Sequence, residues 1–268
     1  MAENKHNSNV YNLSLFWSGV SSKGEIRERN EDTFVALSPL ALSPEYRSGL
    51  FVVSDGIGGH PGGEAASQIV SEKLPEIVRD SAARLKGQSI RAFRDMLRRA
   101  VLELNGLVLS SGLSGRGVAG MGATVVAVLV KGGRCFMVNV GDSRFYLLRN
   151  GRLLQKSRDH SGAALLARNG LIKSEEIQNH PEYNLLTKYI GMEDTIEPFV
   201  RTFRLKRADR LLLCTDGLTD LVAEMRIKDI MRENKECGRC CKLLVEAANS
   251  AGGFDNVTVI VIDISGPG

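Results

Sequence analysis

The sequence has no long apolar run, few aromatic residues and few cysteines. No run reaches the 18 apolar residues that a membrane-spanning helix needs, so no such helix is expected. The first fifteen residues are mostly polar and lack the apolar region of a signal peptide. The five cysteines are an odd number, which favours the reducing cytoplasm over a disulfide framework. The sequence therefore predicts a cytoplasmic protein without a membrane span.

Strong charge of one sign is also missing. The net charge is only +4, and the basic residues are scattered with little aromatic interleaving. A nucleic-acid-binding surface normally gathers its basic residues on one face. No nucleic-acid partner is therefore expected.

A cysteine-based zinc motif is incomplete in this sequence, and a dinucleotide-binding motif stands in the wrong context. Cys237, Cys240 and Cys241 form a tight group, but no second pair or nearby histidine supplies a fourth zinc ligand. We interpret them as ordinary helix cysteines. The segment 115–120 satisfies G-x-G-x-x-G, yet a helical pattern precedes it and a strand pattern follows. A dinucleotide-binding loop requires the opposite order, so we expect a plain connecting loop.

Composition is that of an ordinary globular domain. Of the 268 residues, 43% are hydrophobic and 25% are charged, which is enough to build one core of normal size. Residues 1–12 are predicted to be a disordered tail, and 13–268 to form a single domain. The polar stretch 161–194 is predicted to be a flap segment within that domain, although a plain surface insertion gives the same pattern.

Strand and helix patterns occur in blocks, and the dipeptide Asn150-Gly151 is a hairpin signal. Apolar residues repeat every 3.6 positions after Ser89, a plausible N-cap. Pro75 should kink or split the helix expected over 64–85. The class is therefore α+β with antiparallel sheets. Strands are predicted over 13–20, 33–37, 51–54, 124–130, 134–140, 144–148, 210–214 and 257–264, and further helices over 90–108 and 228–249.

Two of these predicted strands end at the same dipeptide. One runs into Asp55-Gly56 and another, 210–214, into Asp216-Gly217. Asp-Gly is a hairpin signal when alternating strands flank it. Both copies are followed by helix-like residues instead, although the hairpin reading stays open on local pattern alone.

Further carboxylates occupy similar positions. Asp142 follows a strand through a glycine, Asp255 precedes the last strand, and Glu31-Asp32 precedes the strand at 33–37. A cluster of like charges is stable only if cations neutralise it, although six separate solvated carboxylates would give the same spacing. Oxygen ligands suit Mg²⁺ or Mn²⁺ rather than zinc. Two such ions can activate a water for in-line displacement at phosphorus, and Arg27 is the candidate phosphate clamp.

The chain resembles the metal-dependent serine/threonine protein phosphatases of the type 2C class, especially the compact bacterial ones. The resemblance covers about residues 14–264, and its motifs stand in family order. They are R-x-x-N-E-D at 27–32, V-x-D-G-x-G-G-H at 53–60, G-E-x-A-S at 63–67, G-M-G-A-T at 120–124, V-G-D-S-R at 140–144, D-H-S at 159–161, C-T-D-G-L-T-D at 214–220 and G-G-x-D-N-V-T at 252–258.

The resemblance implies an architecture and a set of metal ligands. The fold would be a four-layer αββα sandwich, with two catalytic Mn²⁺ or Mg²⁺ ions at one edge and a third ion in bacterial members. Asp55 would bridge the two ions and the Gly56 carbonyl would bind one of them. The remaining roles implied are Asp216 and Asp255 as ligands of the other ion, Glu31 and Asp32 as direct or water-mediated ligands, Asp142 with Asp216 as the third site, and Arg27 as the phosphate-binding residue.

One departure concerns the leaving group. Animal relatives carry a histidine at position 57, proposed as the general acid, and many bacterial relatives carry methionine. This chain has Ile57, so the resemblance assigns no general acid there. His60 and His160 are interpreted mainly as scaffold residues. A metal-bound water is the alternative proton donor.

The function implied is hydrolysis of phosphoserine and phosphothreonine in proteins by a metal-activated water. Its partners would be phosphorylated proteins, including a cognate kinase and its substrates, and the chain would act as a monomer. A cysteine-nucleophile phosphatase is excluded because no cysteine has arginine six positions later. The alternative is a pseudophosphatase that binds phosphoproteins, but that predicts lost metal carboxylates, and Asp55, Asp216 and Asp255 are present.

Overall fold

The computed structural model describes residues 13–37, 48–57, 62–85, 89–114 and 118–266. The predicted tail 1–12 and His60 lie outside these ranges. Ten strands form two antiparallel five-stranded sheets in the described part of the chain. The first has the order β1 (Ser14–Ser22), β10 (Val257–Ser265), β9 (Arg210–Cys214), β6 (Arg144–Arg149) and β7 (Arg152–Gln155). The second has the order β2 (Asp32–Leu37), β3 (Gly49–Asp55), β4 (Val125–Lys131), β5 (Arg134–Val140) and β8 (Phe199–Arg204).

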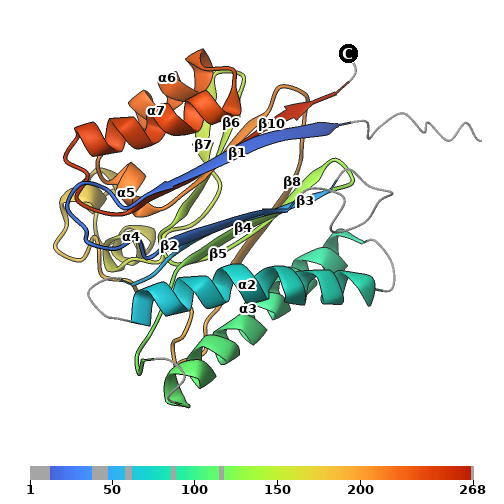
Figure 1. Ribbon diagram of the computed structural model, residues 1–268, viewed down its shortest axis with the longest axis vertical. Coiled ribbons are helices and arrows are strands. Elements are labelled where there is room, and N and C mark those ends of the chain that lie inside the picture. The colour runs from blue at the N-terminus through green and yellow to red at the C-terminus, as the bar shows by residue number, and fades with distance from the viewer. Residues whose placement is uncertain (1–12, 38–47, 58–61, 86–88, 115–117, 267–268) are drawn as a thin grey trace, which may run out of the picture.

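Helices cover both outer faces of this sandwich. The pair α2 (Gly62–Ala83) and α3 (Ile90–Leu113) packs on the second sheet, and α6 (Glu224–Glu233) and α7 (Cys237–Ser250) pack on the first (Figure 1). The predicted α+β class and the αββα layering are confirmed. None of the helices in the described ranges is long and apolar enough to cross a membrane.

The strand pattern explains why two sheets stack face to face. In β3, Leu50 and Val52 point into the core beneath α2 and α3, whereas Phe51 and Val53 point into the core between the sheets. Successive side chains of a strand face opposite sides, so a strand buried on both faces is apolar throughout. The central strands are of this kind, and their apolar runs are the reason that the sequence predicted them well.

The predictions for the first two helices have different outcomes. Helix α2 continues through Pro75, so this residue does not split it. Proline lacks the amide that an interior turn needs, but Pro75 is buried, and tertiary packing there outweighs its low helix propensity. Ser89 caps α3 as predicted, since its hydroxyl accepts a hydrogen bond from the Ala92 amide at 3.1 Å.

The single helix expected over 228–249 is in fact two helices. The side chain of Glu236 accepts hydrogen bonds from two amides and starts α7. The guanidinium of Arg210, the first residue of β9, donates to the carbonyl oxygens of Met231, Asn234 and Lys235 at the end of α6. A partner distant in sequence thus satisfies the carbonyl groups that a helix end leaves free.

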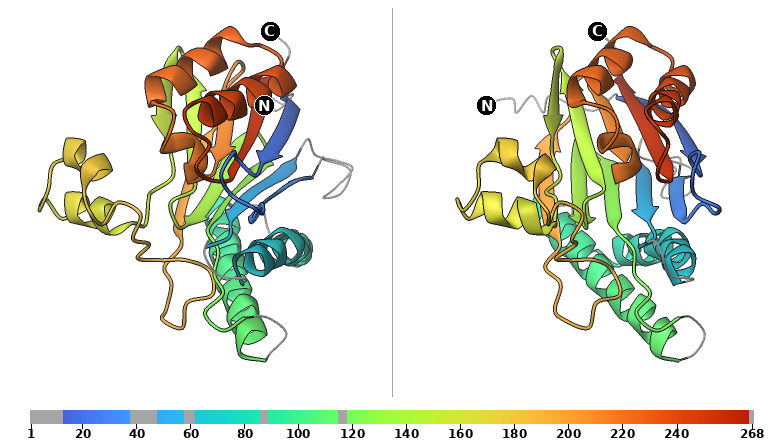
Figure 2. Two further views of the ribbon diagram at one scale, coloured as in Figure 1. Left: turned by 60° about the vertical axis from the view of Figure 1, so that its left-hand side comes forward. Right: turned by 90° about the vertical axis from the view of Figure 1, so that its left-hand side faces the viewer.

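The other local predictions have mixed outcomes. Asn150 and Gly151 both have positive φ and join β6 to β7 as the hairpin signal predicted. Strand β8 is not evident from the sequence pattern, because it lies at a sheet edge and is only partly buried. The segment 161–194 contains α4 (Gly162–Arg168) and the 3-10 helix η1 (Ser174–Asn179), which stand out from the sandwich in Figure 2.

Candidate metal centre

A cavity of about 380 Å³ opens at one end of the sandwich, where several strands begin or end. Residues from both sheets and from the flap segment line it. They are Arg27, Glu31, Asp55, Gly56, Ile57, Thr124, Asp142, Asn184, Leu186, Asp216, Asp220 and Asp255. Every predicted site residue except Asp32 is on this list, so the structure brings together side chains up to 228 positions apart.

Strand pairing is what brings the carboxylates to this end. Asp55 at the end of β3 pairs with Asp32 at the start of β2 in antiparallel register. Asp216 follows β9, whose last residue pairs with the beginning of β10, just after Asp255. In antiparallel sheets the end of one strand lies beside the start of the next. Carboxylates on both kinds of strand end therefore meet at one edge.

Asp32 lies behind the cavity wall instead of in it. Its side chain is buried and accepts a hydrogen bond from the Thr215 hydroxyl at 2.9 Å. It therefore contacts the residue before Asp216 and pairs with Asp55. From there Asp32 can affect the site through its neighbours.

Both Asp-Gly dipeptides need glycine because other backbone segments approach closely. A β-carbon on Gly56 would come within 2.3 Å of the Gly63 carbonyl oxygen. One on Gly217 would come within 2.1 Å of the Asn256 carbonyl oxygen. Contacts of that length are prohibitive for any side chain. The hairpin reading of these dipeptides is wrong, because β3 is followed by α2 and β9 by α5 (Asp216–Thr219), not by a paired strand.

Polar side chains in and behind the cavity wall fix the loops that carry the carboxylates. The Asp55 amide donates to the Thr124 hydroxyl at 3.0 Å, and that hydroxyl is 2.7 Å from the Ser143 hydroxyl, beside Asp142. Asn256 accepts a hydrogen bond from the Glu31 amide at 2.8 Å and donates to two carbonyl groups of the 23–29 loop. Supporting hydrogen bonds of this kind hold metal ligands in position.

Burial of several carboxylates side by side is the dominant electrostatic feature of the cavity. Burial, followed by the charges of Asp32 and Asp216, raises the pKa of Asp55 well above its usual range. Burial also raises the pKa of Asp142, of Asp216 and of Asp32, the last to about 7. Carboxylates crowded away from water resist ionisation unless a cation is present.

The donor set fits a hard divalent cation. Asp32 and Asp216 each have a buried carboxylate oxygen without a hydrogen-bond partner in the described residues. Such atoms are costly unless a ligand or ion satisfies them. In the same ranges, no three acidic, histidine or cysteine side chains stand close enough to enclose an ion unaided. The carboxylates surround the cavity from several sides, which leaves room for the water ligands that Mg²⁺ and Mn²⁺ retain.

Arg27 supplies positive charge at the rim of the cavity. Its guanidinium donates to Asp255 at 2.8 Å, and both side chains are more than a third exposed. Burial disfavours its charge, but Asp255 outweighs that effect and raises the pKa of Arg27. The remaining guanidinium nitrogens can face an incoming anion, in the fork geometry that suits phosphate.

His160 has a structural position. It is buried, and its Nδ1 accepts a hydrogen bond from the Gly141 amide at 3.1 Å. Burial, with smaller effects from Lys188 and nearby arginines, lowers its pKa to about 4. A neutral imidazole held by the backbone next to Asp142 fits the scaffold interpretation.

Sequence reasoning did not single out Asp220 as a site residue. It lies four positions after Asp216 across the short helix α5 (Asp216–Thr219), so both face the same side. The flap contacts it directly, because the Tyr183 hydroxyl donates to Asp220 at 2.8 Å. Burial, followed by the charge of Asp216, raises the pKa of Asp220 to about 6. The spacing within C-T-D-G-L-T-D was the available signal.

The known proteins that this chain resembles are protein phosphatases. The family profile described as protein phosphatase 2C matches residues 29–243. The serine/threonine phosphatase stp of Listeria welshimeri is 33% identical over 243 residues, which cover 91% of this chain and 93% of that protein. The serine/threonine protein phosphatase PstP of Mycobacterium tuberculosis is 33% identical over 252 residues, 94% of this chain and 45% of that protein.

Solved structures give the same result. The serine/threonine phosphatase Stp1 from Staphylococcus aureus has a TM-score of 0.83 and 30% identity, covering 94% of this chain and 96% of that one. The catalytic domain of PstP in complex with two manganese ions has a TM-score of 0.77 and 31% identity, covering 94% and 99%.

Proposed function

The chain belongs to the protein phosphatase 2C family, and we propose that its carboxylate cavity is where phosphate is removed from phosphoserine and phosphothreonine in proteins. The chain is a metal-dependent serine/threonine protein phosphatase. The observation that carries the assignment of the site is the convergence of five aspartates, Glu31 and Arg27 on one cavity.

We assign the metal-holding roles to the cavity carboxylates. The Asp55 carboxylate would bind both ions, and the Gly56 carbonyl would bind one of them. Asp216 and Asp255 would bind the other. Glu31 would act directly or through water, and Asp32, which does not line the cavity, would act through water. Bound Mn²⁺ or Mg²⁺ lowers the pKa of a water so that it attacks phosphorus at neutral pH. The raised pKa values of Asp55 and Asp216 support this assignment, because they mark a site that gains most from added positive charge.

The chain's own side chains then bind and orient the substrate. Arg27 would hold the phosphate oxygens while its contact with Asp255 keeps the guanidinium at the rim. Ile57 and Leu186 line the same cavity and exclude water from one side. The proton for the departing serine or threonine oxygen does not come from position 57, which is apolar. We propose that a water in the cavity supplies it, since the bound ions would make such a water a stronger acid.

A third ion is proposed between Asp142 and Asp216. Both carboxylates line the cavity, and burial and mutual repulsion raise the pKa of Asp142. Asp220 lines the cavity beside them and would bind or orient water for this ion. Its contact with Tyr183 ties the flap to this part of the centre.

A non-catalytic role as a phosphoprotein-binding pseudophosphatase is not supported. That reading requires loss of the metal carboxylates, whereas Asp55, Asp216 and Asp255 are all present and line one cavity. Curated relatives at 30–33% identity are protein phosphatases.

The proposed site is tested by hydrolysis of p-nitrophenyl phosphate with Mn²⁺, with and without EDTA. We expect activity in the wild type to require metal and to fall at least a hundredfold in Asp216→Asn. Activity that survives EDTA, or a fully active variant, would contradict the metal mechanism. A phosphopeptide panel checks the residue type, and a preference for phosphotyrosine would contradict the serine/threonine assignment.

The setting in the cell is also a proposal. All five cysteines are buried and free, which supports a reducing cytoplasm. The cavity is complete within one chain, which supports a monomer, and light scattering would test this. Phosphorylated proteins are the substrates, and we propose a cognate serine/threonine kinase and its targets among them.

A further inference from the structure

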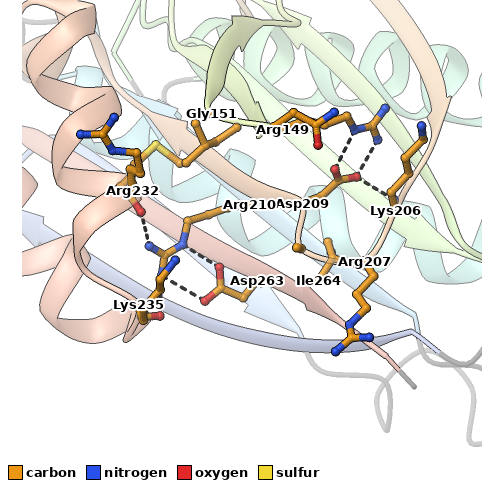
Figure 3. A pocket seen from close by; sticks show the side chains of 14 residues that line it. Arg149, Gly151, Lys206, Arg207, Asp209, Arg210, Arg232, Lys235, Asp263 and Ile264 are labelled. Carbon is orange, nitrogen blue, oxygen red and sulfur yellow. Dashed lines mark hydrogen bonds and ion pairs between the residues drawn. The ribbon is translucent and has the colours of Figure 1, made fainter. Parts of the chain in front are cut away.

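A second cavity, of about 530 Å³, lies at the opposite end of the sandwich. Figure 3 shows the side chains that line it. The β6–β7 hairpin, the turn before β9, the end of α6 and the end of β10 enclose it. Arg210 starts β9 at this cavity, and Asp216 follows β9 at the metal centre, six residues further on. With a rise of about 3.3 Å per residue, the two cavities are about 20 Å apart.

The two acidic residues that line this cavity are each paired with an arginine of the same cavity. Arg149 holds Asp209 through two hydrogen bonds of 2.7 and 2.6 Å. Arg210 holds Asp263 in the same two-pronged manner, at 2.6 and 3.0 Å. Asp209 also accepts a hydrogen bond from the Lys206 amide. The lining carboxylates are therefore already neutralised, and they can offer little to a cationic ligand.

Positive charge remains in excess around these pairs. Lys206 and Arg207 lie on one side of the cavity, and Arg232 and Lys235 on the other (Figure 3). Arg232 contacts two acidic residues of its own helix. Within the described ranges, no ion pair engages the side chains of Lys206, Arg207 or Lys235, and all three are exposed. Their charges are free to attract an anionic group.

We propose that this basic cavity docks an acidic segment of a phosphoprotein substrate while the phosphorylated residue of the same substrate reaches the metal centre. The inference rests on the proposed function, because it requires the metal centre to hydrolyse the phosphorylated residue. Clusters of arginine and lysine commonly recognise acidic motifs. A docking contact at a distance raises the effective concentration of the phosphorylated residue at the metals without altering the chemical step.

The shape of the cavity favours a polypeptide segment over a membrane. Its volume lies in the range of pockets that accept several side chains, whereas a bilayer presents a broad, flat surface. Leu148, Met231 and Ile264 line it but are nearly fully buried, so an entering peptide would meet mainly the charged side chains. The cations sit at the rim, where acidic side chains entering the cavity would meet them.

The test uses synthetic peptides in which a spacer of glycine and serine joins one phosphothreonine to a short block of glutamates. A spacer of about 4 residues spans at most about 14 Å and cannot join the two cavities, whereas one of about 14 residues can span over 40 Å. Matched peptides carry glutamine in place of glutamate. For the wild type with Mn²⁺, we expect the long acidic peptide to have a KM about tenfold lower than its glutamine counterpart, with kcat unchanged.

A variant that reverses three charges tests whether the basic residues of the cavity bind the acidic segment. In Lys206→Glu/Arg207→Glu/Lys235→Glu, the difference between the long glutamate and glutamine peptides should disappear. The control Arg94→Glu/Arg98→Glu/Arg99→Glu makes the same change of charge on exposed positions of α3 and should keep it. Both variants should hydrolyse p-nitrophenyl phosphate at the wild-type rate, because neither alters the metal centre.

The outcomes separate the two proposals. If wild type fails to hydrolyse p-nitrophenyl phosphate with Mn²⁺, the proposed function is wrong. If it is active but treats the long glutamate and glutamine peptides alike, or if the triple variant keeps the difference, the docking inference is overturned. Equal benefit from the short spacer would also overturn it. Binding of the wild type alone to phosphatidylglycerol vesicles, without any peptide effect, would replace the acidic segment with a membrane and reject the inference.

Discussion

Replacing Asp216 with asparagine should make the metal-free protein more stable and the metal-loaded protein inactive. One oxygen of the Asp216 carboxylate is buried and has no hydrogen-bond partner among the residues that the structure describes. The carboxyl groups of Asp216 and Asp55 lie within hydrogen-bonding reach of each other, and burial raises both pKa values. The wild-type site is therefore under electrostatic strain when no cation is bound.

The size of the effect follows from the geometry. A buried polar atom without a partner costs about 1–3 kcal/mol. Asparagine has nearly the same shape, carries no charge and can donate to the Asp55 carboxylate. In EDTA at pH 8, we expect Asp216→Asn to raise the free energy of unfolding by about 2 kcal/mol. For a chain of this length, that corresponds to an increase in Tm of about 6 °C.

Manganese should reverse the order of stability. A ligand present at a hundred times its Kd stabilises the folded state by about 2.7 kcal/mol. The wild type should gain this in Mn²⁺, whereas the variant, having lost a metal carboxylate, should gain little. Differential scanning calorimetry in EDTA and in Mn²⁺, together with p-nitrophenyl phosphate hydrolysis, measures both effects.

Asp263→Asn is the matched control. It makes the same chemical change, but Asp263 is held by Arg210 in a two-pronged ion pair at the far end of the sandwich. This variant should lose stability in EDTA and keep both the gain from Mn²⁺ and the activity. The reasoning would be refuted if Asp216→Asn were destabilised in EDTA, or if it kept the full gain from Mn²⁺.

Four further results are expected. Arg27→Lys keeps a charge but loses the planar fork, so kcat/KM for p-nitrophenyl phosphate should fall about 10- to 100-fold while Mn²⁺ affinity, measured by calorimetry, stays similar. Gly217→Ala should weaken Mn²⁺ binding at least tenfold, because its β-carbon would press on the Asn256 carbonyl; unchanged affinity would contradict the packing argument. Burial raises the pKa of Asp32 to about 7 and of Asp220 to about 6. Without metal, the stability that these two carboxyl groups contribute when protonated is fully present below about pH 4, and it is lost as the pH rises through 6 to 7. The Tm gain on adding Mn²⁺ should therefore grow from pH 5 to pH 8, and a constant gain would count against coupled proton release. Ser89→Ala should cost about 1 kcal/mol of stability through the lost cap and leave activity unchanged.

Local patterns predicted most of the architecture. The central strands are buried on both faces and therefore appear as apolar runs, as in β3 and β9. Asn150-Gly151 predicted its hairpin because both residues must adopt positive φ. The half-buried edge strand β8 lacks such a signal. The break between α6 and α7 was missed because it depends on Arg210, about 25 residues away in sequence.

The sequence by itself determined the fold class, the oxygen ligands available to a metal and the positions of most of them at strand ends. Only the tertiary structure decided that these carboxylates surround one cavity, that Asp32 lies behind its wall and that Asp220 joins them. It also placed the side chains of Lys206, Arg207 and Lys235, which have no ion-pair partner in the described ranges, together at the end of the sandwich opposite the metal centre. Periodicity records whether each residue is buried, which is a local property. Convergence of side chains depends on pairing between strands far apart in sequence, and no local pattern records that pairing.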